Sequence, residues 1–253
     1  MSRGTVAGQS TRVPLSVRAA YALLASLVVP TVGLLTRREF SGFGHIPREG
    51  GCIVSLNHIT ELDPIIVGYA FYVHGIHACF LAKDKLFAPP VMGWAMRAMG
   101  HIPVERGSGG AKSLDAARRV LDYGGTIVIY PEGTLTRDPD LWPMVGRTGA
   151  ARLALATGAP LIPAAQWGAQ RILPQYARRV TLRPKRTLQM SIGTPLDLSA
   201  YQGLSHDREA LQAVTTLALD ETTRLLAALR GEPPPLMRFD PAAGRQRRSD
   251  GPA

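Results

Sequence analysis

Short apolar segments alternate with segments of helical periodicity between residues 39 and 200. The segments 52–56 and 126–130 are nearly all apolar, which is typical of strands that are covered on both faces. The pattern predicts strands at 52–56, 78–82, 101–104, 126–130, 160–165, 180–182 and 188–192.

Helices are predicted between these strands, at 64–73, 90–99, 112–123 and 149–157. A longer helix with one apolar stripe is predicted over 207–230, and Gly231 is expected to end it. Strands that alternate with helices of this length are typically joined by crossover connections. We therefore expect an α/β fold, with a mixed, largely parallel sheet of about seven strands flanked by helices.

The N-terminal segment contains an uncharged stretch between Arg18 and Arg37. A spanning helix needs roughly 20 apolar residues, so this stretch is at the lower limit of that length. Pro30 is expected to kink or end a helix here, and no small-x-small cleavage pattern follows, so a signal peptide is not expected. The flanking arginines suit anionic headgroups. We expect a membrane-associated helical element at 19–36, which either spans or lies in the membrane; a helix packed only on its own protein is the alternative.

The pattern divides the chain into three parts. Residues 1–38 form the N-terminal membrane-associated segment, and residues 39–230 form one α/β domain. Residues 231–253 are rich in Pro, Gly and Arg, and we expect them to be a disordered tail.

Composition narrows the range of partners. Of 253 residues, 45% are apolar, which is enough for a packed core. The only two cysteines, Cys52 and Cys79, lie in apolar segments and are expected to be buried thiols rather than disulfide or zinc ligands. The formal charge of +10 indicates an anionic partner: nucleic acid, an acidic membrane surface or a phosphorylated substrate.

The first candidate motif is Asn57-His58 followed by Asp63. Asn57 and His58 come directly after the predicted strand 52–56, and ligands of open α/β sheets bind beyond the carboxyl ends of the strands. Asp63-Pro64 is typical of a helix start, with Asp63 as N-cap. A short loop would bring the carboxylate to the imidazole, which would fix the tautomer and raise the basicity of the other ring nitrogen. Taken alone, the pattern is also compatible with a simple cap and loop.

The second motif is Glu132-Gly133-Thr134, directly after the strand 126–130. Gly133 permits a positive φ and close approach of backbone N–H groups to an anion, and the Thr134 hydroxyl can donate to a phosphate oxygen. Arg137 and Arg147 follow and offer bidentate contacts to phosphate. Glu132 would repel a phosphate, so orienting an arginine or the loop is its alternative role.

The third motif is 100–106, a short strand that ends in Glu105-Arg106. Arg106 at a strand terminus is a candidate phosphate contact, and a solvated ion pair with Glu105 is the alternative. Lys83 and Lys85 follow the strand 78–82 and are candidate phosphate contacts, or else surface lysines.

The order of these motifs, followed by an apolar strand with Leu161, Ile162 and Pro163, resembles the glycerolipid acyltransferase family of the 1-acyl-sn-glycerol-3-phosphate acyltransferase type. The resemblance covers residues 40 to 200 and implies that His58 is the catalytic base and Asp63 its partner. It also implies that Arg106 binds the acceptor phosphate, and that Glu132, Gly133 and Thr134, which form the third block of the family, bind the same phosphate together with Arg137. Leu135 and Thr136 stand where the family usually has Arg and Ser, so Arg137 or Arg147 is expected to replace that contact.

The resemblance implies a membrane-associated O-acyltransferase of phospholipid biosynthesis. It would transfer a fatty acyl group from acyl-CoA or acyl carrier protein to the hydroxyl of 1-acyl-sn-glycerol 3-phosphate, giving phosphatidic acid, with no cofactor or metal. Asn57, Lys83 and Arg147 are possible contacts of the donor or the acceptor, and Lys85 is a further candidate for the phosphates of a CoA donor. Glycerol 3-phosphate or another lysophospholipid or glycolipid is the alternative acceptor. The expected location is the cell membrane, peripheral or monotopic, with the active site facing the cytoplasm.

Two other classes of protein compete with this interpretation. A nucleic-acid-binding protein would account for the charge, but aromatic residues make up only 6% of the chain and are not interleaved with a basic stripe. A metal hydrolase would need a carboxylate to complete a ligand set with His74 and His77, and the neighbouring sequence offers none. Nucleic acid is therefore not an expected partner, whereas a lysophospholipid, an acyl thioester and an anionic membrane surface are.

Overall fold

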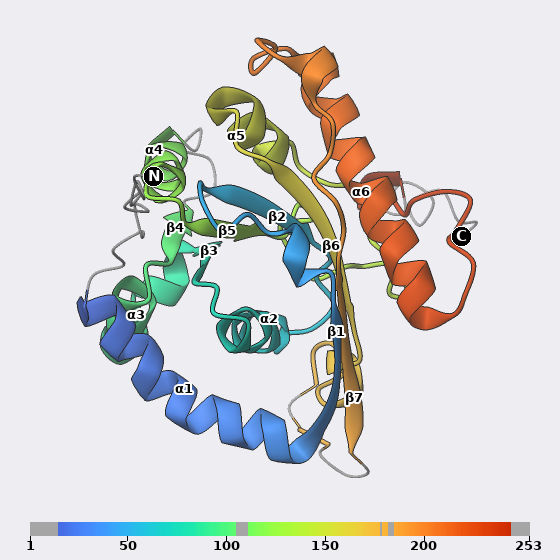
Figure 1. Ribbon diagram of the computed structural model, residues 1–253. Coiled ribbons are helices and arrows are strands. Elements are labelled where there is room, and N and C mark those ends of the chain that lie inside the picture. The colour runs from blue at the N-terminus through green and yellow to red at the C-terminus, as the bar shows by residue number, and fades with distance from the viewer. Residues whose placement is uncertain (1–14, 105–110, 178, 182–184, 244–253) are drawn as a thin grey trace, which may run out of the picture.

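A single mixed sheet lies at the centre of the molecule (Figure 1). The computed structural model describes residues 15–104, 111–177, 179–181 and 185–243. Within them, seven strands are arranged in the order β1-β7-β6-β2-β5-β3-β4. Their bounds are β1 Thr36–Ser41, β2 Cys52–Leu56, β3 Ala78–Lys83, β4 Ile102–Val104, β5 Thr126–Ile129, β6 Leu161–Trp167 and β7 Arg186–Ile192. The strands from β6 to β4 are parallel, while β7 pairs antiparallel with β6 and parallel with β1. The predicted mixed, largely parallel sheet is confirmed.

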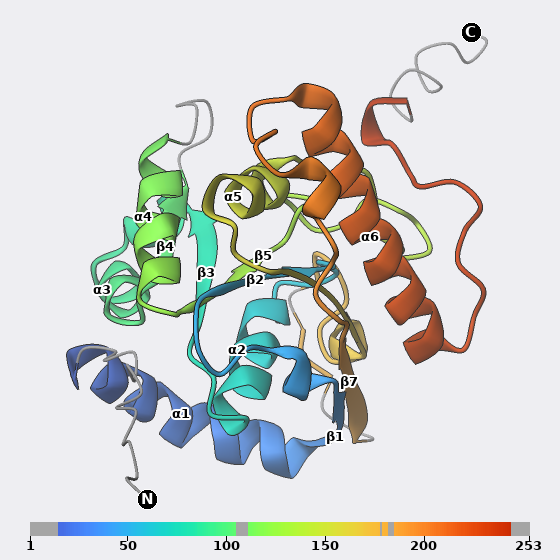
Figure 2. The ribbon, with the colours of Figure 1, turned by 45° about the horizontal axis from the view of Figure 1, so that its top comes forward.

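Helices cover both faces of the sheet (Figure 2). On one face, α2 packs Val67, Ala70 and Phe71 against β2, β3 and β5. On the other face, α4, α5 and α6 pack against β2, β5 and β6. The helix bounds are α1 Leu15–Leu35, α2 Asp63–Val73, α3 Pro90–Ala98, α4 Ala111–Asp122, α5 Gly149–Thr157 and α6 Arg208–Arg230.

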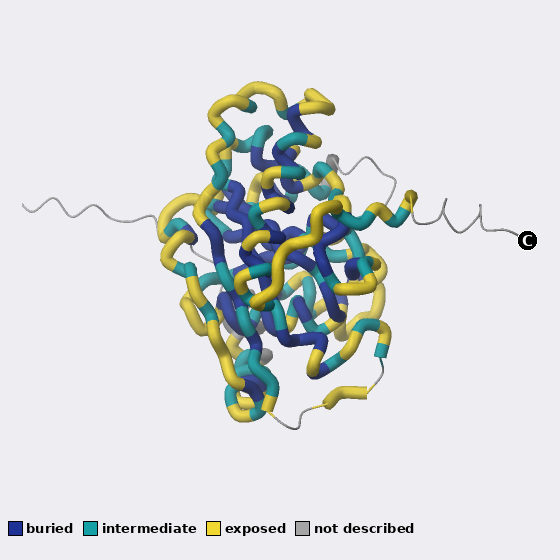
Figure 3. The backbone as a smooth tube through the Cα atoms, turned by 90° about the vertical axis from the view of Figure 1, so that its right-hand side faces the viewer, coloured by how far each residue is buried: buried dark blue, intermediate teal, exposed yellow. Residues whose placement is uncertain are grey.

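The most apolar strands lie deepest in the sheet. All residues of β2 and β5 are buried, because helices from both faces exclude water from them. Figure 3 shows the buried backbone concentrated in this central layer. Cys52 in β2 and Cys79 in β3 are both buried thiols, as predicted. Burial raises the pKa of Cys79 to about 12, so this thiol is not a candidate nucleophile.

The helix α1 extends along the outer side of α2 before the chain enters β1 (Figure 1). Val32 packs against Ile66 and Tyr69 of α2. Contrary to expectation, the helix does not end at Pro30 but continues to Leu35. Pro30 is exposed, so the hydrogen bond that proline removes is lost at the surface rather than in the core. Among the described residues, no helix combines the length and the apolarity needed to cross a bilayer.

One predicted strand is wrong, and one observed strand was not predicted. Val180 and Thr181 lie in a loop, where the Thr181 N–H donates to Ile172 O at 2.7 Å; residue 182 lies outside the described residues. The edge strand β1 was missed because its sequence is polar and most of its residues are exposed. Its pairing with β7, about 150 residues later, has no local signal in the sequence.

The C-terminal helix begins and ends as its sequence predicts. The Asp207 carboxylate accepts from the Ala210 N–H at 2.7 Å, and Gly231 ends the helix with φ 67°. Residues 232–243 were predicted to belong to a disordered tail but instead lie beside α6. Arg238 forms an ion pair with Asp220 at 2.6 Å, and Phe239 O accepts from Val145 N at 3.0 Å. These contacts order the segment; residues 244–253 lie outside the described residues.

Candidate active site

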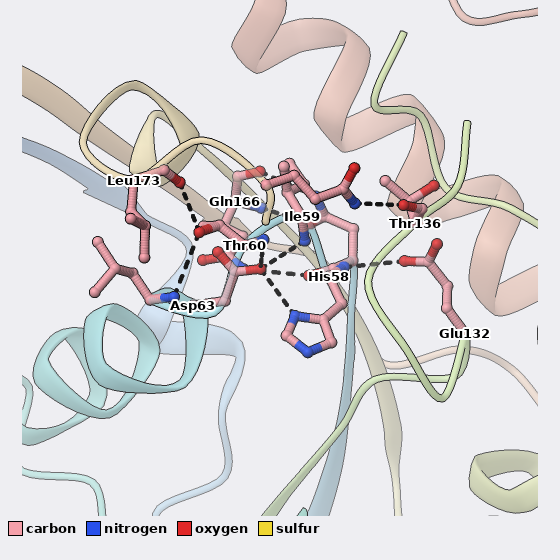
Figure 4. A network of polar contacts seen from close by, with 11 residues as sticks. His58, Ile59, Thr60, Asp63, Glu132, Thr136, Gln166 and Leu173 are labelled. Atoms are coloured by element: carbon pink, nitrogen blue, oxygen red, sulfur yellow. Dashed lines mark hydrogen bonds and ion pairs between the residues drawn. The ribbon is translucent and has the colours of Figure 1, made fainter. Parts of the chain in front are cut away.

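Two loops that follow neighbouring strands meet at the carboxyl edge of the sheet. The strand β2 pairs in parallel with β5, so that Ser55 lies beside Ile129. His58 follows β2 and Glu132 follows β5, and the two residues are therefore brought together although they are far apart in the sequence. The His58 N–H donates to Glu132 Oε1 at 2.9 Å, and the Thr136 N–H donates to His58 O at 2.7 Å. Figure 4 shows this network.

His58 and Asp63 form the expected pair. His58 Nδ1 lies 2.9 Å from Asp63 Oδ2, and the imidazole is partly accessible, with 17% of its side chain exposed, whereas Asp63 is 1% exposed. His58 lies in a loop, and Asp63 is the first residue of α2. The predicted N-cap role is wrong, because the carboxylate turns back to the loop and Leu62 occupies the cap position.

Three hydrogen-bond donors converge on one oxygen of Asp63. Besides His58 Nδ1, the Ile59 N–H donates to Oδ2 at 2.6 Å and the Thr60 N–H donates at 2.9 Å. Burial raises the pKa of Asp63, and these hydrogen bonds oppose that rise by stabilising the carboxylate. A carboxylate can only accept, so His58 donates through Nδ1–H and Nε2 keeps its lone pair. In Figure 4 the second ring nitrogen points away from Asp63.

One face of the His58 imidazole is covered by Tyr130. The two ring centroids lie 4.1 Å apart at an interplanar angle of 17°. Burial raises the pKa of the Tyr130 hydroxyl well above 10, so the phenol stays neutral. The stacked Tyr130 ring fixes the plane of the imidazole, and the hydrogen bond from Nδ1 to Asp63 fixes its rotation within that plane.

Glu132 connects the two loops rather than facing a ligand. It is 3% exposed; Oε1 accepts from His58 N, and Oε2 accepts from Met144 N at 3.1 Å. The prediction that Glu132 contacts the acceptor phosphate does not fit this geometry, because both oxygens are engaged by backbone donors in a buried position. Its alternative role, orienting the loop, does fit.

The buried Glu132 carboxyl is expected to make stability depend on pH. Burial raises its pKa from 4.5 to about 8. The folded protein thus retains a proton that the unfolded chain releases near pH 4.5, so the stabilisation present below pH 4.5 is lost as pH rises to about 8. Relative to Glu132→Gln, we expect the wild-type free energy of unfolding to fall by about 1–2 kcal/mol between pH 6.5 and 8.

Urea unfolding of the wild type and of Glu132→Gln at both pH values tests this expectation. Burial lowers the pKa of His101 to about 4. The titration of His101 therefore changes the free energy of unfolding mainly below pH 6.5, outside the range of this comparison. If the free energy of unfolding changed equally with pH in the two proteins, the assignment of the retained proton to Glu132 would be wrong.

Asn57 secures the loop against the strand on the other side of β2. It is 1% exposed; Nδ2 donates to Gln166 O at 3.1 Å, and Oδ1 accepts from Gln166 N at 2.8 Å. Gln166 Nε2 returns a bond to Asn57 O at 3.2 Å. These bonds use both ends of the amide, so Asn57 does not fit the predicted contact with donor or acceptor. Gln166 was not singled out from the sequence. Its polar side chain directly after the apolar segment 160–165 was the signal that could have identified it.

Among the predicted phosphate ligands, the structure brings Gly133 and Arg147 together. Gly133 has φ 69°, which favours glycine, and a Cβ at this position would lie 3.0 Å from Arg147 Nε, so the arginine side chain passes close to the turn. Arg147 is exposed, and its N–H donates to Pro131 O at 2.8 Å. Thr134 is partly buried, and Arg137 is exposed after the same turn.

Two of the other predicted ligands lie at the carboxyl end of the strand β3 or just after it. Lys83 is exposed at the carboxyl end of β3, and Lys85 is exposed two residues later. Arg106 and Glu105 lie outside the described residues. Among the described residues no cluster of His, Cys, Asp and Glu could hold a metal ion.

The fold and the His58–Asp63 pair together define an α/β enzyme with a partly exposed histidine, oriented by a buried carboxylate, at the carboxyl edge of its sheet. The acyltransferase family model matches residues 37–167, which include the His58 loop, the Glu132 turn and all of β2, β3, β4, β5 and β6. The chain belongs to the acyltransferase family.

Its relatives include named enzymes. A 1-acyl-sn-glycerol-3-phosphate acyltransferase of Bacillus subtilis is 28% identical over 171 residues, which cover 68% of this chain and 79% of that protein. One of Borreliella burgdorferi is 34% identical over 49% of this chain and 48% of its own length. A chloroplastic one of Brassica napus is 30% identical over 54% of this chain and 39% of its own length. The chain thus spans less than half the length of the latter two.

The crystal structure of the 1-acyl-sn-glycerophosphate acyltransferase of Thermotoga maritima has the same fold. The TM-score is 0.62, with 81% of this chain and 80% of that chain covered, and the sequence identity is 20%. The similarity therefore extends over most of both chains, beyond the segment that the family model matches.

Proposed function

We propose that this protein transfers a fatty acyl group from acyl-CoA or acyl carrier protein to the free hydroxyl of 1-acyl-sn-glycerol 3-phosphate, giving phosphatidic acid. The named activities of the bacterial and chloroplastic relatives support this choice of acceptor. The single observation that carries the proposal is the 2.9 Å contact between His58 Nδ1 and a buried carboxylate, which leaves Nε2 as a base.

The proposed reaction has two chemical steps, addition to give a tetrahedral intermediate and collapse of that intermediate. His58 Nε2 removes the proton of the acceptor hydroxyl while its oxygen attacks the thioester carbonyl carbon. The C–S bond breaks as the carbonyl re-forms, and the imidazolium returns the proton to the leaving thiolate. An ester and a free thiol result, and His58 regains its starting form. Asp63 stabilises the transient imidazolium, and no protein nucleophile takes part.

In this proposal the acceptor phosphate binds at the Gly133-Thr134 turn. The Thr134 hydroxyl and the Arg147 and Arg137 guanidinium groups are the donors, and Arg106 is the proposed further contact. Arg147 lies against the Gly133 turn, which supports its place in such a site. Fixing the phosphate would hold the neighbouring hydroxyl at Nε2, which replaces a random encounter by a positioned one.

We also propose that the enzyme acts at the cell membrane, facing the cytoplasm, with residues 1–38 in contact with the bilayer. The net charge of +10 supports attraction to anionic lipids, and the lysophospholipid acceptor itself resides in membranes. Acyl-CoA or acyl carrier protein then approaches from the aqueous side, where the exposed Lys83 is a candidate contact for its phosphate groups.

Thiol release from acyl-CoA tests this function against a panel of acceptors. We expect 1-acyl-sn-glycerol 3-phosphate to be used roughly 10–100-fold more efficiently than the phosphate-free monoacylglycerol, because each charged hydrogen bond to the phosphate contributes about 1.5–3 kcal/mol. Glycerol 3-phosphate as the best acceptor would support the alternative substrate. Equal use of the phosphate-free acceptor would contradict the phosphate site, and no thiol release with either donor would contradict the function.

A matched pair of arginine variants sharpens this test. Arg147→Met should raise KM for the phosphorylated acceptor without changing KM for the phosphate-free one. Arg152→Met removes an exposed arginine from α5 and should change neither. Equal effects of the two variants would exclude Arg147 from the phosphate site.

A further inference from the structure

The last residue of α6 lies between two tryptophans from other elements. The Arg230 guanidinium carbon is 4.0 Å from the Trp142 ring centroid and 4.5 Å from the Trp167 ring centroid. Only 7% of the Arg230 side chain is exposed. Nη1 donates to Asp140 O at 2.7 Å and Nε donates to Glu232 Oε2 at 2.9 Å, so the buried charge is paired. A planar cation held by two aromatic rings and two acceptors fixes three segments of the chain relative to one another.

The first tryptophan leads directly to the His58 loop. Trp142 is buried in the segment between β5 and α5. Its carbonyl accepts from Thr136 Oγ1 at 2.6 Å, and the Thr136 N–H donates to His58 O at 2.7 Å. Two hydrogen bonds therefore separate the ring that Arg230 contacts from the backbone of His58.

The second tryptophan leads to the same loop from the opposite side. Trp167 follows Gln166, whose backbone and side chain make three hydrogen bonds with Asn57. Asn57 is the residue before His58. Arg230 thus connects the two segments that hold the His58 loop, one on each side of β2.

We propose that Arg230 is a positioning residue for acyl transfer. By clamping Trp142 to Trp167, it keeps the His58 loop at the spacing that places Nε2 against the acceptor hydroxyl. Arg230 does not touch the substrate, and it acts through Thr136 and Asn57 on the backbone around His58. This role rests on the proposed function of His58 as the base.

The effect should appear in turnover rather than in substrate binding. A displacement of the reacting groups by about 1 Å can cost roughly 100-fold in rate. For Arg230→Met, which keeps length and apolar packing, we expect kcat per folded molecule to fall at least about 10-fold, with KM for both substrates within about 2-fold. Arg230→Lys keeps the charge but not the planar stack, and should fail to restore kcat.

Arg224 provides the matched control. It lies on the same helix and pairs with Glu221, with Nε–Oε2 at 2.8 Å, but its side chain is exposed. Arg224→Met should behave as wild type in every assay. A fall in melting temperature for Arg230→Met, with unchanged kcat per folded molecule, would show a merely structural clamp and overturn the proposal.

A second measurement keeps the test independent of activity. We expect the Nδ1–H proton of His58, which is hydrogen-bonded to Asp63, to give a low-field proton NMR signal that can be assigned by its loss in His58→Gln. We expect this signal to shift or broaden in Arg230→Met and Arg230→Lys but not in Arg224→Met. If Arg230→Met does not fold, Arg230→Lys decides the outcome. An unchanged NMR signal in the folded variants overturns the proposal.

Absence of thiol release by the wild type overturns the proposed function, and with it the link between Arg230 and acyl transfer.

Discussion

Replacing His58 with alanine is expected to lower the rate of acyl transfer by on the order of 10²–10⁴, the usual contribution of a positioned general base. The variant retains the backbone N–H that donates to Glu132 and the carbonyl that accepts from Thr136, because both bonds are made by the main chain. The loop and the acceptor site should therefore persist, and the loss should fall on kcat. Thiol release and a thermal unfolding curve for the purified variant measure the two effects.

His74 serves as the control for this variant. It is an exposed histidine just after α2, stacked on Phe43 rather than lying near the carboxyl edge. His74→Ala should retain wild-type turnover. Substantial turnover by a folded His58→Ala protein would remove His58 from the mechanism, whatever the melting temperature of the variant.

Asp63→Asn is expected to reduce kcat by about 10²–10⁴ with little change in folding, since an amide does not stabilise the imidazolium as a carboxylate does. The asparagine carbonyl can take the place of Oδ2 and still accept from the Ile59 and Thr60 N–H groups. The amide nitrogen then replaces Oδ1, which has no hydrogen-bond partner among the residues that the structure describes, so no existing hydrogen bond is lost. The substitution thus removes the charge and keeps the bonds that shape the loop.

Asp63→Ala separates structure from catalysis at the same position. It leaves the two backbone donors buried and unpaired, at a cost of about 1–3 kcal/mol for each. We expect a lower free energy of unfolding in Asp63→Ala but not in Asp63→Asn, and an exposed control, Asp115→Asn, should match the wild type in both assays. Wild-type kcat in Asp63→Asn would mean that His58 acts without its carboxylate.

The elements that the sequence predicts well are those whose environment is uniform along the element. The strands β2 and β5 are covered on both faces, so their apolar composition was sufficient to identify them. The helix α6 has one buried stripe and clear caps at Asp207 and Gly231. The edge strand β1 has neither property, because it faces solvent and is defined by its pairing with β7.

Some residues of the candidate site could likewise be predicted from the sequence, and others could not. Local order along the chain was enough to single out His58, Asp63 and the Gly133 turn, since a loop of a few residues after a buried strand has little freedom in where it points. The sequence left the role of Glu132 open between a phosphate contact and orientation of the loop, and it did not indicate the supporting role of Asn57, because each role depends on partners more than 70 residues away.

From the sequence alone follow the α/β class, the strands and helices of its core, the acyltransferase family motifs and the histidine and carboxylate that pair at 2.9 Å. Only the tertiary structure decided that Glu132 and Asn57 support the loop and that Arg230 lies between two tryptophans. The physical reason is that short-range patterns record which face of an element is buried, whereas hydrogen bonds and ring contacts between distant segments exist only once the sheet has brought the strand ends together.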